Sequence, residues 1–165
     1  MKIKKLILLC GCFVALMGGD YEIGMEALKN NDFAKAHEYL SKSCQNDNNI
    51  DACFEMSLLY LVLDDNKSKQ TALQNISILC ANNHVNSCRL QAILFVKDGK
   101  EAEAFTMDQK VCMLDKKFCN FLAYYYENGL VVRQNVTQAI KYYQESCNAG
   151  NNSGCESLQK LYNKK

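Results

Sequence analysis

Proline is absent from this chain of 165 residues. Because proline interrupts helix interiors and is common in the loops of all-β folds, its absence favours helices joined by short turns. An excess of charge of one sign is also missing, since 19 Lys and Arg residues oppose 18 Asp and Glu residues. We therefore expect no electrostatic field that would attract nucleic acid, and no nucleic-acid partner.

An apolar run long enough to span a bilayer is missing as well. The uncharged run over residues 6–19 has 14 residues, whereas a membrane-spanning helix needs about 20. It follows three lysines and ends in Gly18 and Gly19, which is typical of a secretory signal peptide over residues 1–19. We therefore expect no stable membrane span and an exported protein, periplasmic or secreted. The alternative is a lipoprotein, because residues 9–12 loosely resemble a lipobox with Cys12 as the lipidated residue.

Cysteine, in contrast, is abundant and periodic. Eight cysteines follow the signal segment, and they form pairs separated by 9, 8, 7 and 8 residues that recur with a period near 34. An even count in an exported chain indicates a disulfide framework, and a fixed period indicates a repeat protein. The period selects local pairs: Cys44–Cys53, Cys80–Cys88, Cys112–Cys119 and Cys147–Cys155.

Zinc is the rival explanation for these cysteines. Structural zinc sites prefer cysteines two to four residues apart, often with histidine. The cysteine pairs are more widely spaced than that, and only His37 and His84 are available. We expect no metal, and structural roles for both histidines.

Between the cysteines, apolar residues recur at helical spacing and Asn-rich or Gly-containing turns separate them. This pattern predicts an all-α repeat domain over residues 20–165. Its helical hairpins cover about 20–46, 50–82, 84–114 and 116–149, and a capping helix covers 151–163. Each disulfide would then join the end of one hairpin to the start of the next. Stacked hairpins bury a continuous core that a single hairpin cannot form, so we expect an α/α solenoid.

Residues 123–129 (AYYYENG) and 138–143 (QAIKYY), followed by Cys147 and Gly154-Cys155, resemble a Sel-one-like repeat, a relative of the tetratricopeptide repeat. With its local cysteine pairs, the chain resembles the Helicobacter cysteine-rich protein family. Residues 33–36 resemble the first repeat of that family. The resemblance implies a right-handed solenoid, and the two middle repeats depart from the family pattern.

The resemblance implies two different functions. Repeat solenoids generally bind peptides or proteins on a concave surface. Members of the cysteine-rich family are also described as penicillin-binding proteins and weak β-lactamases, which would imply a cell-wall or β-lactam ligand. Serine β-lactamases require Ser-x-x-Lys, Ser-Asp-Asn and Lys-Thr-Gly motifs. This chain contains one Ser-x-x-Lys, from Ser157 to Lys160, and neither of the other two motifs. We therefore expect a binding scaffold, with Ser157 and Lys160 as the weak catalytic alternative.

The tetratricopeptide relationship also implies where a ligand would bind. The first helices of successive hairpins, within 50–63, 84–97 and 116–128, would line a groove. We expect exposed polar and aromatic side chains there, with an outward tyrosine from the run at 124–126 as an anchor. The expected partner is a protein or peptide rather than a cofactor, and the chain is expected to be a monomer.

A modification site is suggested by the sequence DDNKS at residues 64–68. Asn-x-Ser is the acceptor pattern for N-glycosylation in exported proteins. The bacterial pathway prefers an acidic residue two places earlier, which Asp64 supplies. Asn66 is therefore a candidate glycosylation site in a predicted turn.

Overall fold

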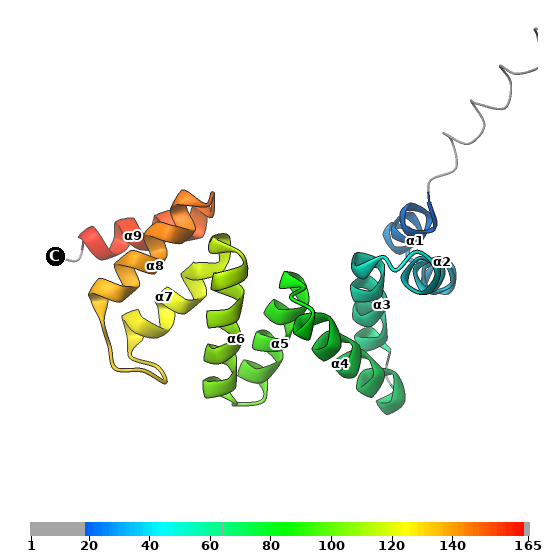
Figure 1. Ribbon diagram of the computed structural model, residues 1–165, viewed down its shortest axis with the longest axis horizontal. Coiled ribbons are helices and arrows are strands. Elements are labelled where there is room, and N and C mark those ends of the chain that lie inside the picture. Colours follow the sequence, from blue (N-terminus) through cyan, green and yellow to red (C-terminus); the bar gives the residue numbers. More distant parts are fainter. Residues whose placement is uncertain (1–18, 64, 164–165) are drawn as a thin grey trace, which may run out of the picture. The chain divides into compact units, whose positions relative to one another are not determined.

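The computed structural model describes residues 19–63 and 65–163, in which all regular secondary structure is helical (Figure 1). The α-helices are α1 (Asp20–Lys29), α2 (Phe33–Asn46), α3 (Ile50–Val62), α4 (Asn66–Ala81), α5 (Val85–Lys97), α6 (Glu101–Leu114), α7 (Cys119–Asn128), α8 (Val136–Asn148) and α9 (Asn152–Asn163), and a 3₁₀ helix, η2 (Lys116–Phe118), precedes α7. The predicted all-α solenoid of hairpins with a last, unpaired helix is confirmed. The predicted signal peptide, apart from Gly19, and the alternative lipidation site Cys12 lie outside the described residues.

The chain divides into two compact units, and the boundary falls within α4, after Asn75. In the first unit, α1 and α2 form an antiparallel hairpin, and α3 packs against α2. Small and aliphatic side chains fill the core of this unit, among them Ala36 and Leu40 of α2 and Ala52 of α3, none of which is exposed. The predominance of alanine lets the helix axes approach closely.

The second unit contains two further hairpins, α5 with α6 and α7 with α8, and α9 packs on α8. One cluster holds Phe105 of α6 against Leu122 and Tyr125 of α7, and another holds Tyr143 of α8 against Leu158 of α9. Each cluster joins one hairpin to the next element, as the packing of a solenoid requires.

The helices end in a recurrent way. A residue with left-handed backbone follows α1, α2, α4, α5, α7 and α8, and it is asparagine in the first three cases and glycine in the others: Asn31, Asn48, Asn83, Gly99, Gly129 and Gly150. Asparagine and glycine are the residues that tolerate this conformation best. The Asn-rich turns therefore end helices in the same way as the glycines.

Four disulfides join helices that follow one another in the chain: Cys44–Cys53, Cys80–Cys88, Cys112–Cys119 and Cys147–Cys155. Each links the end of a second helix to the beginning of the next helix along the chain. The disulfide-stapled fold is thus confirmed.

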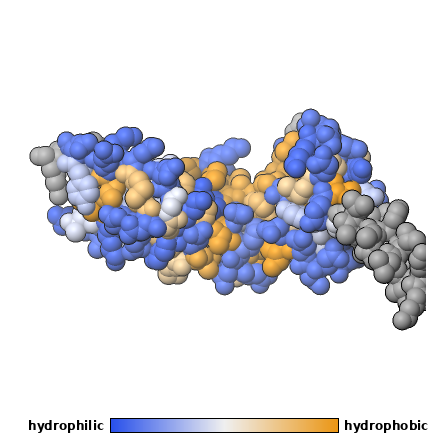
Figure 2. All heavy atoms as spheres, turned by 90° about the horizontal axis from the view of Figure 1, so that it is seen from above, coloured by the Kyte–Doolittle hydropathy of each residue, from blue (hydrophilic) through white to orange (hydrophobic). Residues whose placement is uncertain are grey.

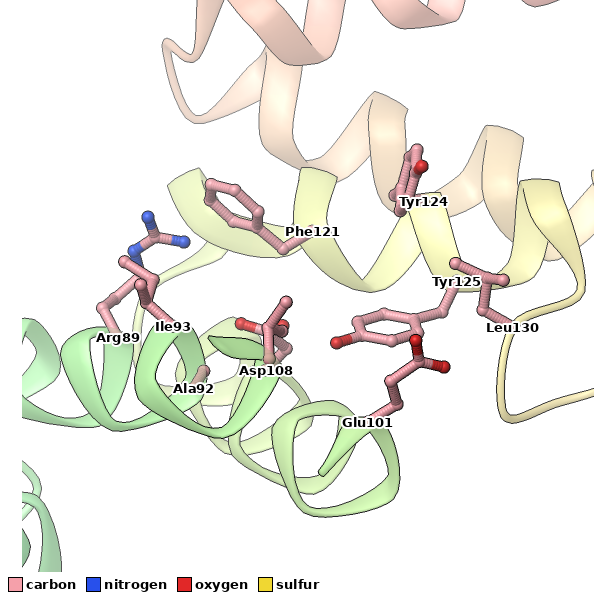
Figure 3. A pocket seen from close by; sticks show the side chains of 10 residues that line it. Arg89, Ala92, Ile93, Glu101, Asp108, Phe121, Tyr124, Tyr125 and Leu130 are labelled. Atoms are coloured by element: carbon pink, nitrogen blue, oxygen red, sulfur yellow. The ribbon is translucent and has the colours of Figure 1, made fainter. Parts of the chain in front are cut away.

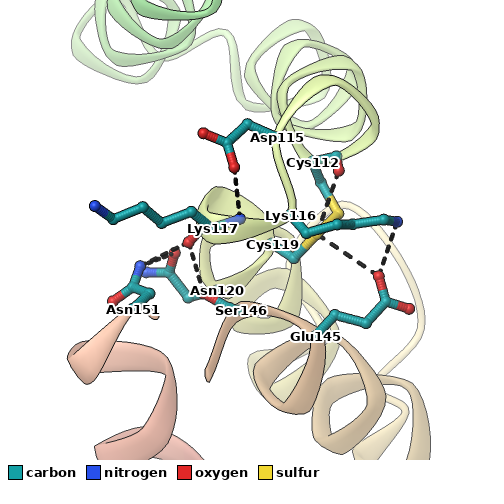
Figure 4. Close-up of a disulfide and its surroundings, with 9 residues drawn as sticks. All are labelled: Cys112, Asp115, Lys116, Lys117, Cys119, Asn120, Glu145, Ser146 and Asn151. Carbon is teal, nitrogen blue, oxygen red and sulfur yellow. Dashed lines mark hydrogen bonds and ion pairs between the residues drawn. A yellow bond between two sulfur atoms is a disulfide. The ribbon is translucent and has the colours of Figure 1, made fainter. Parts of the chain in front are cut away.

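The link between α6 and α7 is reinforced by polar contacts around η2 (Figure 4). The backbone carbonyl of Lys117 accepts hydrogen bonds from the Ser146 hydroxyl and the Asn151 side-chain amide, both at 2.7 Å. Lys116 pairs with Glu145 of α8 at 2.9 Å. These contacts connect η2 to α8 and to the turn before α9.

Among the described helices, none has both the length and the apolar character needed to cross a membrane.

Candidate functional site

A pocket of about 290 Å³ lies in the second unit between α5 and α7 (Figure 3). Its lining residues come from α5, α6, α7 and the loop after α7: Arg89, Ala92, Ile93, Val96, Glu101, Asp108, Phe121, Tyr124, Tyr125 and Leu130. We call this site the α5–α7 pocket. It lies between the first helices of two successive hairpins, and α6, which packs against both of them, contributes Glu101 and Asp108 to its lining.

The exposed rim of the pocket is largely apolar. Ile93 and Val96 lie one turn apart on α5 and are 52% and 53% exposed, and Tyr124 of α7 is 54% exposed. In the space-filling view, hydrophobic residues reach the surface at several places among hydrophilic ones (Figure 2). Ala92, Asp108 and Tyr125 are buried beneath this rim. The pocket thus combines apolar walls with a polar base.

Arg89 occupies one end of the pocket. Its guanidinium carbon lies 3.7 Å from the centre of the Phe121 ring and 4.9 Å from that of Phe118. Burial lowers the pKa of Arg89, and the charge of Asp108 opposes that effect. The aromatic faces therefore hold the guanidinium in place.

Asp108 at the base is a buried carboxyl group. Burial raises its pKa from 3.8 to about 6, although the positive charge of Arg89 and a hydrogen bond from the Tyr125 hydroxyl both act in the opposite direction. The pKa of Tyr125 is raised to about 12 by its own burial and by the neighbouring Asp108 charge. A carboxyl group with a raised pKa in a pocket is a frequent mark of a functional site.

The groove predicted along the first helices stays a prediction, but some of its expected segments meet at the α5–α7 pocket. Two of the three expected segments, 84–97 and 116–128, contribute to the pocket, while 50–63 belongs to the first unit. Tyr124 faces outward and Tyr125 inward, as expected for adjacent residues of one helix. The expectation of a mainly polar and aromatic lining was wrong in one respect, because Ile93, Val96 and Leu130 add an aliphatic wall.

Sequence reasoning missed Asp108 and Arg89. A signal for Asp108 was available, since it follows Ala104 by four residues and precedes Cys112 by four, and both of these are buried residues on one face of α6. A charged residue on an apolar helix face is unusual, because a buried charge is costly unless an opposite charge or a hydrogen-bond donor lies beside it. Arg89 carries no such signal, because its aromatic neighbours come from the next hairpin.

The two residues of the catalytic alternative, Ser157 and Lys160, both lie on α9, outside the α5–α7 pocket. The Ser157 hydroxyl hydrogen-bonds the Tyr143 hydroxyl, which itself donates to Glu127 at 2.8 Å. Lys160 is exposed. The structure thus gives Ser157 a tyrosine partner that links α9 to α8.

Three residues with metal-ligating atoms, Cys112, Cys119 and Glu145, lie together, with those atoms within 4.8 Å of one another. The two sulfur atoms are joined in a disulfide, so neither is a thiolate. Glu145 pairs with Lys116 instead. Only reduction would free thiolates here, so the oxidised protein does not offer this group to a metal.

The remaining candidates occupy surface positions. His37 Nε2 and the Tyr60 hydroxyl hydrogen-bond at 2.8 Å in the first unit, and His84 Nδ1 contacts the Ser87 hydroxyl at 2.7 Å before α5. Asn66 is the exposed first residue of α4. Asp65 just before it accepts a hydrogen bond from the Ser68 backbone N–H at 2.7 Å. Glycosylation of Asn66 stays a prediction.

The comparisons with known proteins support the fold. The family model of the Sel1 repeat matches residues 15–48 and 117–151. A Sel1 repeat protein from Oxalobacter formigenes has a similar structure, with a TM-score of 0.75 and 20% identity over 87% of this chain. A protective antigen of uropathogenic Escherichia coli with an SLR fold has a TM-score of 0.69 and 17% identity over 88% of this chain. The chain spans 62% and 33% of the lengths of these two proteins.

A third solved structure shares more of the sequence. Helicobacter pylori cysteine rich protein B is 30% identical, with a TM-score of 0.56, over 77% of this chain and 95% of its own. A comparison with curated proteins finds no match. The chain, with its hairpins, its period and its disulfide in each repeat, therefore belongs to the cysteine-rich Sel1 repeat proteins that include Helicobacter pylori cysteine rich protein B.

Proposed function

We propose that the protein is an exported scaffold that binds a peptide or protein segment in the α5–α7 pocket. Sel1 repeats are protein-interaction modules, and solenoids use the surface formed by successive repeats to hold their ligands. The observation that carries the proposal is the open, mostly apolar pocket between the first helices of two hairpins.

The size of the pocket favours a side chain as the part of the ligand that enters it. Sites for small molecules occupy about 300–1,000 Å³, and this pocket, at about 290 Å³, lies at the lower limit. Its rim carries an exposed aromatic residue, Tyr124, and two exposed aliphatic ones. Such a surface can hold one anchoring side chain while the flanking backbone runs over α5 and α7.

A displayed peptide library tests the proposal. The purified, oxidised protein should enrich related peptides, and Ile93→Glu should weaken their binding at least tenfold by placing a charge in the apolar wall. Ile78→Glu is a matched control, because Ile78 on α4 is also 52% exposed but does not line the pocket. Failure to enrich any peptide, or equal binding by the two variants, would contradict the proposal.

The proposed export has a separate test. The four disulfides fit an oxidising compartment. Protein recovered from the periplasm or medium should begin near Asp20 when its N-terminus is sequenced. Incorporation of a labelled fatty acid that depends on Cys12 would instead support the lipoprotein alternative.

A further inference from the structure

We infer that the α5–α7 pocket takes the side chain of a lysine or arginine residue from its peptide ligand. The inference rests on the proposed function and specifies its ligand class. Three features carry it, namely the position of two acidic groups, the apolar walls above them and the way in which Arg89 is already engaged.

The acidic groups lie where the end of an inserted side chain would arrive. Asp108 is 6% exposed and lies at the base of the pocket, and Glu101 is exposed at its rim. Figure 3 shows the Tyr125 ring between these groups, with its hydroxyl toward Asp108. Against the single positive charge of Arg89, the two carboxylates give the lining a net charge of −1 at neutral pH.

The apolar walls suit the stem of a long basic side chain. Lysine and arginine bury their methylene chains along apolar surface while their charged ends reach polar groups. Ile93 on α5 and Phe121 on α7 lie on opposite sides of the pocket, and Val96 and Tyr124 also line it, so a methylene chain would have apolar surface on both sides. The ring faces of the tyrosines would add attraction for a cation.

Arg89 does not block a cation at the acidic end of the pocket. Its guanidinium stacks on Phe121, and Figure 3 places Arg89 and Glu101 at opposite ends of the pocket, with Asp108 between them. A ligand cation could thus approach Glu101 and Asp108 while the arginine keeps its aromatic partners. A neutral or acidic side chain would leave the two carboxylates without this compensation.

Small probes test the side-chain preference directly. We would titrate Nα-acetyl-lysine methylamide, which keeps a charged side chain, into the oxidised protein and follow backbone amide signals by NMR. The corresponding norleucine and glutamate compounds would be titrated in the same way. The lysine probe should shift signals of α5 and α7 and bind at least fivefold more tightly than the norleucine probe. The glutamate probe should bind most weakly.

Two variants and a pH series separate charge recognition from apolar contact. Asp108→Asn and Glu101→Gln should each reduce the preference for lysine over norleucine, whereas Glu103→Gln, on the same helix but outside the pocket, should leave it unchanged. The preference should also fall from pH 7 to pH 5 as Asp108 gains a proton beside Arg89, Tyr125 and Glu101. The NMR spectrum of each variant reports whether it is folded.

The outcomes distinguish this inference from the proposed function. If norleucine binds the pocket as well as lysine does, or if both pocket variants keep the lysine preference, the inference is wrong while the peptide scaffold stands. If no probe binds up to its solubility limit, the inference is also wrong, and the displayed library then decides the proposed function on its own.

Discussion

At the scale of the residue, Asp108 is the least expected feature of the protein. Its carboxyl is buried in the second unit, and burial raises its pKa from 3.8 to about 6. The charge of Arg89 and the hydrogen bond from Tyr125 lower the pKa, but their combined effect is smaller than that of burial. Between about pH 4 and 6, the folded protein therefore holds a proton that the unfolded chain has released. The contribution of this group to stability falls as the pH rises through that window. The difference between the two pKa values corresponds to about 3 kcal/mol at pH 7.

Replacing this carboxyl with a neutral amide should therefore stabilise the fold. We expect Asp108→Asn to raise the free energy of unfolding by up to about 3 kcal/mol at pH 7 and by little at pH 4, because the native carboxyl is then protonated. Urea unfolding at the two pH values measures this difference. Asp98→Asn, in the exposed turn before α6, serves as the control. If Asp108→Asn raised the free energy of unfolding equally at pH 7 and pH 4, the stabilisation would not come from removing a buried negative charge.

At the scale of the element, the contact between α8 and α9 depends on a glycine. A Cβ atom on Gly154 would lie 2.8 Å from the Ser146 hydroxyl oxygen and 3.1 Å from the backbone nitrogen of Cys147. Ser146 is buried, and its hydroxyl is bound to the Lys117 carbonyl, so it has little room to move. The small residue thus sets how closely the last helix approaches the stack.

We expect Gly154→Ala to destabilise the protein by about 1–2 kcal/mol, since overpacking outweighs the better helix propensity of alanine. Ser153→Ala, the exposed neighbour on α9, should change the stability little. Chemical unfolding of both variants checks the prediction. A Gly154→Ala variant as stable as the parent would show that α9 can shift away from α8.

The disulfide between α6 and α7 links two helices that line the pocket. Replacing both Cys112 and Cys119 with alanine should cost about 2–3 kcal/mol through the freedom that the unfolded chain regains. It should also weaken binding of a pocket ligand, because α7 carries Phe121 and Tyr124 while α6 carries Asp108.

The pair Cys44–Cys53 offers a matched control in the first unit. Its removal should give a similar loss of stability without a change in ligand affinity. Unfolding curves and titrations of both double variants test this difference. Equal loss of affinity in both would mean that the disulfides act only through overall stability.

At the scale of the whole molecule, we expect all four disulfides to be formed. If residues 1–19 are removed on export, as proposed, the protein should contain no free thiol under denaturing, non-reducing conditions, because the eight cysteines that follow them form four local pairs. Thiol titration and peptide mapping measure this. Several free thiols, or disulfides between distant repeats, would contradict the assignment of one local disulfide to each repeat.

The whole molecule should also lack β-lactam hydrolysis. The only Ser-x-x-Lys motif places Ser157 against Tyr143, and Lys160 is exposed. We expect no turnover of a chromogenic cephalosporin by the pure protein, and no effect of Ser157→Ala. Turnover that accompanies the protein through every purification step would favour the enzymatic alternative over the scaffold.

Features that depend on short-range order could be predicted from the amino-acid sequence. Helix periodicity, the Asn and Gly turns and the cysteine spacing are local, so the hairpins and the disulfide pairs between neighbouring helices could be predicted from them. The same periodicity could have placed Asp108 on the buried face of α6, because Ala104 and Cys112 lie four residues before and after it, but Asp108 was missed. Helix geometry predicted that one tyrosine of the run 124–126 faces outward, and the structure shows that Tyr124 is the exposed one while Tyr125 is buried.

The α5–α7 pocket, the proposed binding site, depends on tertiary packing. Ile93 and Val96 have the one-turn spacing of core residues, yet they remain half exposed because α5 and α7 leave a pocket between them. Arg89 of α5 meets Phe121 only because α7 packs on the preceding hairpin and brings this ring to 3.7 Å from the guanidinium. These contacts depend on the distance and angle between hairpins, which are set by packing across repeats, and no local pattern in the sequence specifies them.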